Sequence, residues 1–154
     1  MCDLCDGMSL EEVIEREQRL LDEYGWLVQM VEAEELGGSW AYSVGLAANF
    51  GRPDLLVRNA EAMPAGRMVT DVGKMVAEGG GLDEAELAER GWFLFEVDPD
   101  TLEPHQVGEW EKLAGRPVRP GDFLEIVSLG APRGTIRPAT AGAGRPRWRP
   151  TGWR

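Results

Sequence analysis

Five short apolar runs, separated by turns and by stretches of helical periodicity, constrain the fold of this 154-residue chain most strongly. Most of them contain β-branched or aromatic residues, which are typical of buried or half-buried strands. The runs are residues 26–31, 39–46, 55–57, 92–97 and 123–127. The first two flank Gly37-Gly38 and are expected to pair in antiparallel fashion. The sequence therefore predicts an α+β fold, with a mostly antiparallel sheet of about five strands and two to three helices packed on it.

Helix signals occupy the intervals between these runs. Ser9 and Glu12 have the spacing of a capping box, in which each side chain accepts a hydrogen bond from the other residue's backbone amide. An apolar stripe at helical spacing follows, and Gly25 can end the helix in the left-handed conformation. The stripe consists of Leu10, Val13, Ile14, Leu21 and Tyr24. Further helices are predicted from Pro64 to the glycines at 79–81, from Asp83 to Gly91, and around residues 108–115.

Charge divides the chain into two parts. The net charge is −11, but residues 131–154 contain six arginines and no acid, so that segment carries +6 and residues 1–130 carry −17. We expect residues 1–130 to form one domain and residues 131–154 to be an Arg/Pro/Gly-rich tail. An acidic domain repels nucleic acid and anionic membranes at long range, so only the tail is expected to bind phosphate. Alternatively, the tail folds back on the acidic domain.

Localisation is predicted from what the sequence lacks. No apolar run approaches the roughly 20 residues that span a bilayer. The first six residues, Met1-Cys2-Asp3-Leu4-Cys5-Asp6, have neither the basic nor the apolar region of a secretory signal. With only two cysteines, the chain is expected to be cytoplasmic and to keep its thiols reduced.

The Cys2-x-x-Cys5 pair is the first candidate for chemistry. Two intervening residues let both sulfurs face one metal ion or close a tight disulfide. A zinc site would use Cys2, Cys5, His105 and one carboxylate, from Asp3 or Asp6. The other interpretations are a redox pair, or two small thiols packed against the sheet.

His105 is the second candidate, because it is the chain's only histidine and titrates near neutrality without perturbation. It lies in a polar segment that is expected to be a loop. There it would serve as a general base for Cys5 or Ser43, or would simply be exposed. A single histidine excludes any site that needs two.

The third candidate lies where a predicted strand ends in glycine and a polar loop follows. Such a place lets a ligand approach the backbone closely. Tyr42, Ser43, Arg52 and Asp54 are expected to line one ligand-binding site here. The alternative is that Arg52 forms an ion pair, either with Asp54 or with the acidic helix.

The segments quoted so far, taken in order, resemble the bacterial DUF4262 family. The resemblance rests on the N-terminal cysteine pair, on Tyr24-Gly25-Trp26-Leu27-Val28-Gln29, and on Trp40-Ala41-Tyr42-Ser43-Val44-Gly45-Leu46 with Arg52-Pro53-Asp54-Leu55. It covers residues 1 to about 80 well and thins beyond Val97. This chain has Arg52 where the family often has histidine, and Asp54 where it often has glutamate. The family brings no established reaction, so the resemblance implies a compact fold more than an activity.

Two functional hypotheses follow. The first is a non-enzymatic binding, regulatory or accessory protein with a surface at Tyr42–Asp54 that takes a protein or a small molecule. It is motivated by a clustered polar motif without a complete catalytic set. The alternative is a small metal- or thiol-dependent enzyme that uses Cys2, Cys5 and His105, with zinc as the expected metal.

Overall fold

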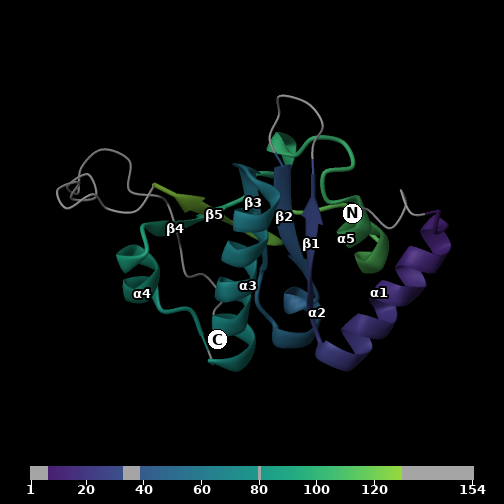
Figure 1. The fold of residues 1–154 in the computed structure, drawn as a ribbon, viewed down its shortest axis with the longest axis horizontal. Coiled ribbons are helices and arrows are strands. Elements are labelled where there is room, and N and C mark those ends of the chain that lie inside the picture. Colours follow the sequence, from purple (N-terminus) through teal and green to yellow (C-terminus); the bar gives the residue numbers. More distant parts are fainter. Residues whose placement is uncertain (1–6, 33–38, 80, 130–154) are drawn as a thin grey trace.

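The computed structural model describes residues 7–32, 39–79 and 81–129, which form one five-stranded sheet with helices on both faces (Figure 1). The strand order is β1-β2-β3-β5-β4. The strands are β1 (Leu27–Val31), β2 (Ser39–Val44), β3 (Asp54–Ala60), β4 (Trp92–Glu96) and β5 (Phe123–Ser128). All neighbours pair antiparallel except β3 and β5, which run parallel. The predicted α+β class and mostly antiparallel sheet are therefore confirmed.

Five α-helices accompany the sheet within the described residues. They are α1 (Leu10–Tyr24), α2 (Leu46–Phe50), α3 (Ala62–Glu78), α4 (Glu84–Glu89) and α5 (Gly108–Ala114), with a 3₁₀ turn at Pro99–Thr101. The long helix α3 crosses strands β1 to β3, whereas α1 lies beside β1 and contacts α5 (Figure 1). All four predicted helical segments are present, and α2 is an addition to them.

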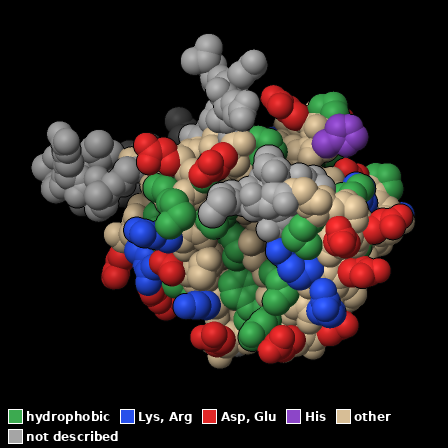
Figure 2. All heavy atoms as spheres, turned by 45° about the vertical axis from the view of Figure 1, so that its right-hand side comes forward, with side chains coloured by type: hydrophobic (Ala, Val, Ile, Leu, Met, Phe, Trp, Pro, Cys, Tyr) green, Lys and Arg blue, Asp and Glu red, His purple; other side chains and the backbone are tan. Residues whose placement is uncertain are grey.

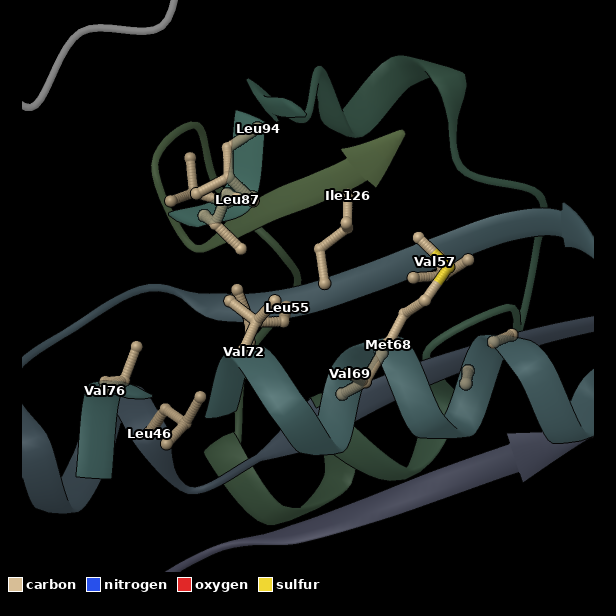
Figure 3. Close-up of a cluster of buried hydrophobic side chains, with 13 residues drawn as sticks. Leu46, Leu55, Val57, Met68, Val69, Val72, Val76, Leu87, Leu94 and Ile126 are labelled. Atoms are coloured by element: carbon tan, nitrogen blue, oxygen red, sulfur yellow. The ribbon is translucent and has the colours of Figure 1, made fainter. Parts of the chain in front are cut away.

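The face of the sheet under α3 and α4 is apolar. Leu55 and Val57 of β3 and Ile126 of β5 point to this face, and they pack against Val69 and Val72 of α3 (Figure 3). Each of these five side chains is at least 98 % buried. Burial of this kind stabilises a fold by about 1.5–3 kcal/mol per side chain. This face therefore holds the main core of the domain.

The opposite face packs against α1 and α5 and mixes apolar with polar side chains. Leu56 and Phe123 belong to a second cluster, together with Trp110 of α5 and Leu21 of α1. Each is next in sequence to a residue whose side chain points to the other face. Phe123 lies 5.2 Å from the ring of Trp110, measured between centroids. The strict alternation along β3 and β5 thus builds two cores from the same strands.

Helix α1 confirms the predicted caps but uses its apolar stripe only in part. Both hydrogen bonds of the capping box are present, and Gly25 ends the helix at φ 83°. Leu10 and Tyr24, however, are 39 % and 63 % exposed, whereas Glu17 is buried. The helix buries Val13, Glu17 and Leu21, which are four residues apart, so an acid occupies the middle of its inward face.

The segment after β2 forms a short helix where the sequence predicts only a turn. Gly45 leaves the strand at φ 105°, and α2 then runs to Gly51, which ends it at φ 64°. The carboxylate of Asp54 accepts hydrogen bonds from the first amides of α2, at Leu46 and Ala47. Helix α2 therefore depends on Asp54, which follows it in the sequence, and the residues of the helix itself do not reveal this dependence.

Some apolar side chains remain at the surface. Met30 and Met63 are 51 % and 57 % exposed, and Figure 2 shows hydrophobic side chains in the middle of one face with charged ones around them.

Among the described residues, no helix is both long and apolar enough to cross a membrane. The arginine-rich segment 131–154 lies outside the described residues.

Of the two glycines that flank α2, Gly45 is predicted to tolerate substitution less well than Gly51. A Cβ at this position would lie 2.6 Å from the carbonyl oxygen of Gly25 and 2.7 Å from a methyl of Leu21. Gly51 also has a positive φ, but a Cβ there meets nothing within 4 Å. We expect Gly51→Ala to lower the free energy of unfolding by about 1 kcal/mol, through backbone strain alone, and Gly45→Ala by about 3 kcal/mol. Urea unfolding of both variants measures the difference, and equal losses would contradict this account.

Candidate functional site

A cleft of about 880 Å³ lies between α1, α2 and α5. This volume falls within the range of small-molecule sites, about 300–1,000 Å³. The cleft is lined by the second half of α1, the β2–α2 connection, the first residue of β3 and the end of α5. Its described lining comprises Gln18, Leu21, Asp22, Glu23, Tyr24, Gly25, Val44, Gly45, Ala47, Ala48, Asn49, Asp54, Trp110, Leu113, Ala114 and Arg116. Two smaller hollows, of about 560 and 400 Å³, lie beside α4 and the end of α3.

Asp54 lies at the bottom of the cleft and is 1 % exposed. Its Oδ1 accepts hydrogen bonds from the Ser43 hydroxyl at 2.6 Å and from the Leu46 amide at 3.0 Å. Its Oδ2 accepts from the Trp110 indole at 2.8 Å and from the Ala47 amide at 3.5 Å. One carboxylate therefore joins the end of β2, the start of α2, the start of β3 and helix α5.

The Ser43 hydroxyl is fully used in this arrangement. It donates to Asp54 and accepts from the Leu55 amide at 2.8 Å, and the residue is 0 % exposed. A serine nucleophile needs a base that takes its proton and an open path to substrate. Ser43 has no such path, so its geometry is that of a structural bridge between β2 and β3.

Burial raises the pKa of Asp54 to about 6, from an ordinary value of 3.8. The hydrogen bonds from Ser43, Trp110 and the two α2 amides act in the opposite direction, because each favours the charged form. At neutral pH the side chain is therefore mostly ionised, as four donors around one carboxylate require. A perturbed carboxylate at the base of a cleft is a common mark of a functional site.

Acidic groups predominate around the opening of the cleft. Asp22 and Glu23 occupy the last turn of α1, which has no basic residue and ends in the negative pole of the helix dipole. The cleft's one described cation, Arg116, donates two hydrogen bonds to Asp122, at 2.6 and 2.9 Å. Its guanidinium also lies over the Trp110 ring, 5.2 Å from the centroid. The local field therefore favours a positive ligand.

A second polar cluster lies where α1 and α5 meet. Glu17 of α1 is 1 % exposed, and the Gln29 amide nitrogen donates to its Oε1. The Tyr42 hydroxyl donates to Oε2 of Glu109 in α5 at 3.4 Å. Burial raises the pKa of Glu17 to about 7, and the neighbouring Glu109 adds to the effect. Burial also raises the pKa of Tyr42, so its hydroxyl stays protonated.

The structure brings together only two of the four residues predicted for the ligand site. Ser43 and Asp54 are hydrogen-bonded partners, and Asp54 lines the cleft. Tyr42 belongs instead to the cluster with Glu109, and Arg52 is half-buried and is not among the described residues that line the cleft. The sequence does not predict that Trp110 belongs to this site, because Trp110 lies 56 positions from its hydrogen-bond partner Asp54.

The predicted metal site is only partly within view. Cys2, Cys5, Asp3 and Asp6 lie outside the described residues. His105 is exposed in the loop before α5, at φ 66°. Within residues 7–32, 39–79 and 81–129, no three or more His, Cys, Asp or Glu side chains are grouped to hold a metal ion. A cysteine-based zinc site therefore stays a prediction.

Comparison with known proteins gives one match. The family model described as "Domain of unknown function (DUF4262)" matches residues 20–110. This range begins within α1 and ends at Trp110, so it contains Ser43, Asp54 and the residues bonded to them. No curated protein and no solved structure matches the chain significantly.

The hydrogen bonds to Asp54 are predicted to set its pKa. Trp110→Phe replaces the indole by a smaller aromatic ring without the N–H donor, so the pKa of Asp54 is expected to rise from about 6 to about 7 or higher. The fold disfavours the ionised carboxylate, so the free energy of unfolding falls as the pH rises from about 4 to the folded pKa of Asp54. In the variant this pKa is higher, so the fall continues to a higher pH than in the wild type. Carboxyl NMR titration measures the pKa. Trp92→Phe in β4, which is not a partner of Asp54, is the matched control, and an unchanged pKa in Trp110→Phe would contradict the prediction.

Proposed function

This chain belongs to the DUF4262 family, a domain of unknown function, and we propose that it binds a small organic cation in the cleft between α1, α2 and α5. The observation that carries the proposal is the charge of the cleft. Asp22, Glu23 and Asp54 line it, and its one described guanidinium is bonded to a further carboxylate, Asp122. A cation that enters this cleft therefore meets carboxylates both at the opening and at the base.

The apolar lining supports an organic cation rather than a bare metal ion. Leu21, Val44 and Leu113 supply aliphatic surface, and Tyr24 at the opening is 63 % exposed. Aromatic rings attract organic ammonium groups, and aliphatic surface takes their methylene chains. A bound divalent metal ion would instead need several protein ligands close together, and the described residues hold no group of three or more His, Cys, Asp or Glu that could supply them.

Binding rather than catalysis fits the state of the polar groups. Asp54 already accepts four hydrogen bonds, and Ser43 uses both its donor and an acceptor position within the fold. Neither is available to exchange a proton with a substrate without breaking the structure. The alternative of a metal- or thiol-dependent enzyme with Cys2, Cys5 and His105 receives no supporting observation from the described residues.

A matched pair of probes tests the charge requirement. Cadaverine carries two ammonium groups, and pentanediol has the same carbon chain without charge. We expect cadaverine to shift the amide NMR signals of residues 21–25 and 45–49 and the Trp110 indole signal, with an affinity that falls as salt is added. Pentanediol is expected to cause little change at the same concentrations. Equal shifts with both probes, or shifts spread over the whole acidic surface, would contradict the proposal.

Removing the two acids at the end of α1 tests the proposed position. The Asp22→Asn/Glu23→Gln variant is expected to bind cadaverine about tenfold more weakly, because it loses two nearby charges, each worth roughly 0.5–1 kcal/mol at this exposure. The matched control is Glu11→Gln/Glu15→Gln, which removes two exposed charges from the first half of the same helix. Similar losses in both variants would show that only net charge matters.

A further inference from the structure

The junction between α1 and α5 contains an electrostatic conflict. Glu17 is 1 % exposed and Glu109 is half-buried. They accept hydrogen bonds from Gln29 and Tyr42, which are paired across β1 and β2, so the two carboxyl groups lie close together. Two ionised carboxylates at this separation repel strongly when little water surrounds them. The conflict matters because α1 and α5 are two of the three helices that line the cleft.

Two hydrogen-bond donors among the described residues reach the pair, one on each carboxyl group. The Gln29 amide reaches Oε1 of Glu17, and the Tyr42 hydroxyl reaches Oε2 of Glu109. Oε2 of Glu17 is buried and has no hydrogen-bond partner among the described residues. A buried carboxylate oxygen without a hydrogen-bond partner destabilises the fold, because it has lost its water and gained no donor in exchange. A proton on this oxygen would turn it into a donor toward Glu109 and remove both the repulsion and the unmet hydrogen bond.

We propose that Glu17 and Glu109 share one proton, as an acid–carboxylate pair that holds α1 against α5, and that loss of this proton loosens α1 and widens the cleft. The first half of the proposal concerns the fold alone. Its consequence for ligand binding rests on the proposed function. A proton suffices here, because it removes one of the two negative charges, and with it their repulsion, and needs no further ligands.

The surrounding groups agree with this assignment. Among the described residues, Arg16 on α1 is the cation whose attraction lowers the pKa of Glu17, but burial and Glu109 outweigh it. Gln29 on β1 is uncharged, and Tyr42 on β2 stays protonated. The folded pKa of Glu17, about 7, lies above its ordinary value of 4.5. The shared proton is therefore present below about pH 7, and its stabilising effect is lost as the pH rises through that value.

Hydrogen exchange of the intact chain tests the proposal without any ligand. Protection factors of the α1 amides, corrected for intrinsic exchange, are compared at about pH 5.5 and about pH 8. We expect protection in the wild type to be several-fold lower at the higher pH in α1, with little change in α3. Glu17→Gln carries the donor permanently, so its α1 protection is expected to be high at both pH values. Glu15→Gln, an exposed neighbour on the same helix, is expected to behave like the wild type.

Each result decides the matter. Unchanged α1 protection in the wild type would overturn the shared proton, and so would a Glu17→Gln variant that keeps the full pH dependence. In the latter case the dependence belongs to Asp54, whose pKa of about 6 lies in the same window. Higher α1 protection at about pH 8 when calcium is added to the wild type, matching the level at about pH 5.5, would mean that the pair binds a metal ion and would also overturn the shared proton. Cadaverine binding to Glu17→Gln, measured at both pH values, separates this proposal from the proposed function. If the cleft binds organic cations, the variant binds cadaverine whether or not Glu17 and Glu109 share a proton in the wild type.

Discussion

The carboxylate of Asp54 is the interaction on which the rest of this structure depends. It takes donors from β2, α2 and α5 at once, although it is itself the first residue of β3. Without it, the amides at the start of α2 and the buried indole of Trp110 would lack their acceptor. Because unmet hydrogen bonds in a dry interior cost more than made ones contribute, this one side chain fixes the relative positions of four elements. The cleft lies directly above it.

The two faces of the sheet are held in different ways. The face under α3 and α4 is an apolar core, in which shape and volume determine stability. The face under α1 and α5 adds two buried acids, Asp54 and Glu17, each with a raised pKa. Because these two carboxyl groups titrate in the folded protein, the stability of this face depends on pH, whereas purely apolar packing does not. The cleft is therefore on the face that is better suited to respond to pH and to ligand.

The sequence predicts local structure well, because the signals are local. The capping box at Ser9, the left-handed Gly25 and the apolar runs all lie within a few residues of the elements that they define. The parallel β3–β5 pair, helix α2 and the Asp54–Trp110 bond were not predicted, because each joins residues that are distant in sequence or relies on a later residue. Ser43 and Asp54 were identified as polar residues of interest, but their mutual burial was not. Glu17 lies four residues from both Val13 and Leu21 on the inward face of α1, so its burial is consistent with helical spacing alone.

The central claim is that the cleft is the binding site and that charge selects its ligand. Intermolecular nuclear Overhauser effects between the methylene protons of cadaverine and the ring protons of the cleft's aromatic residues test it most directly. The account predicts contacts to Trp110 and Tyr24, with none to Trp92 on the far edge of the sheet. Contacts only to residues outside the cleft, or their complete absence at saturating cadaverine, would contradict it.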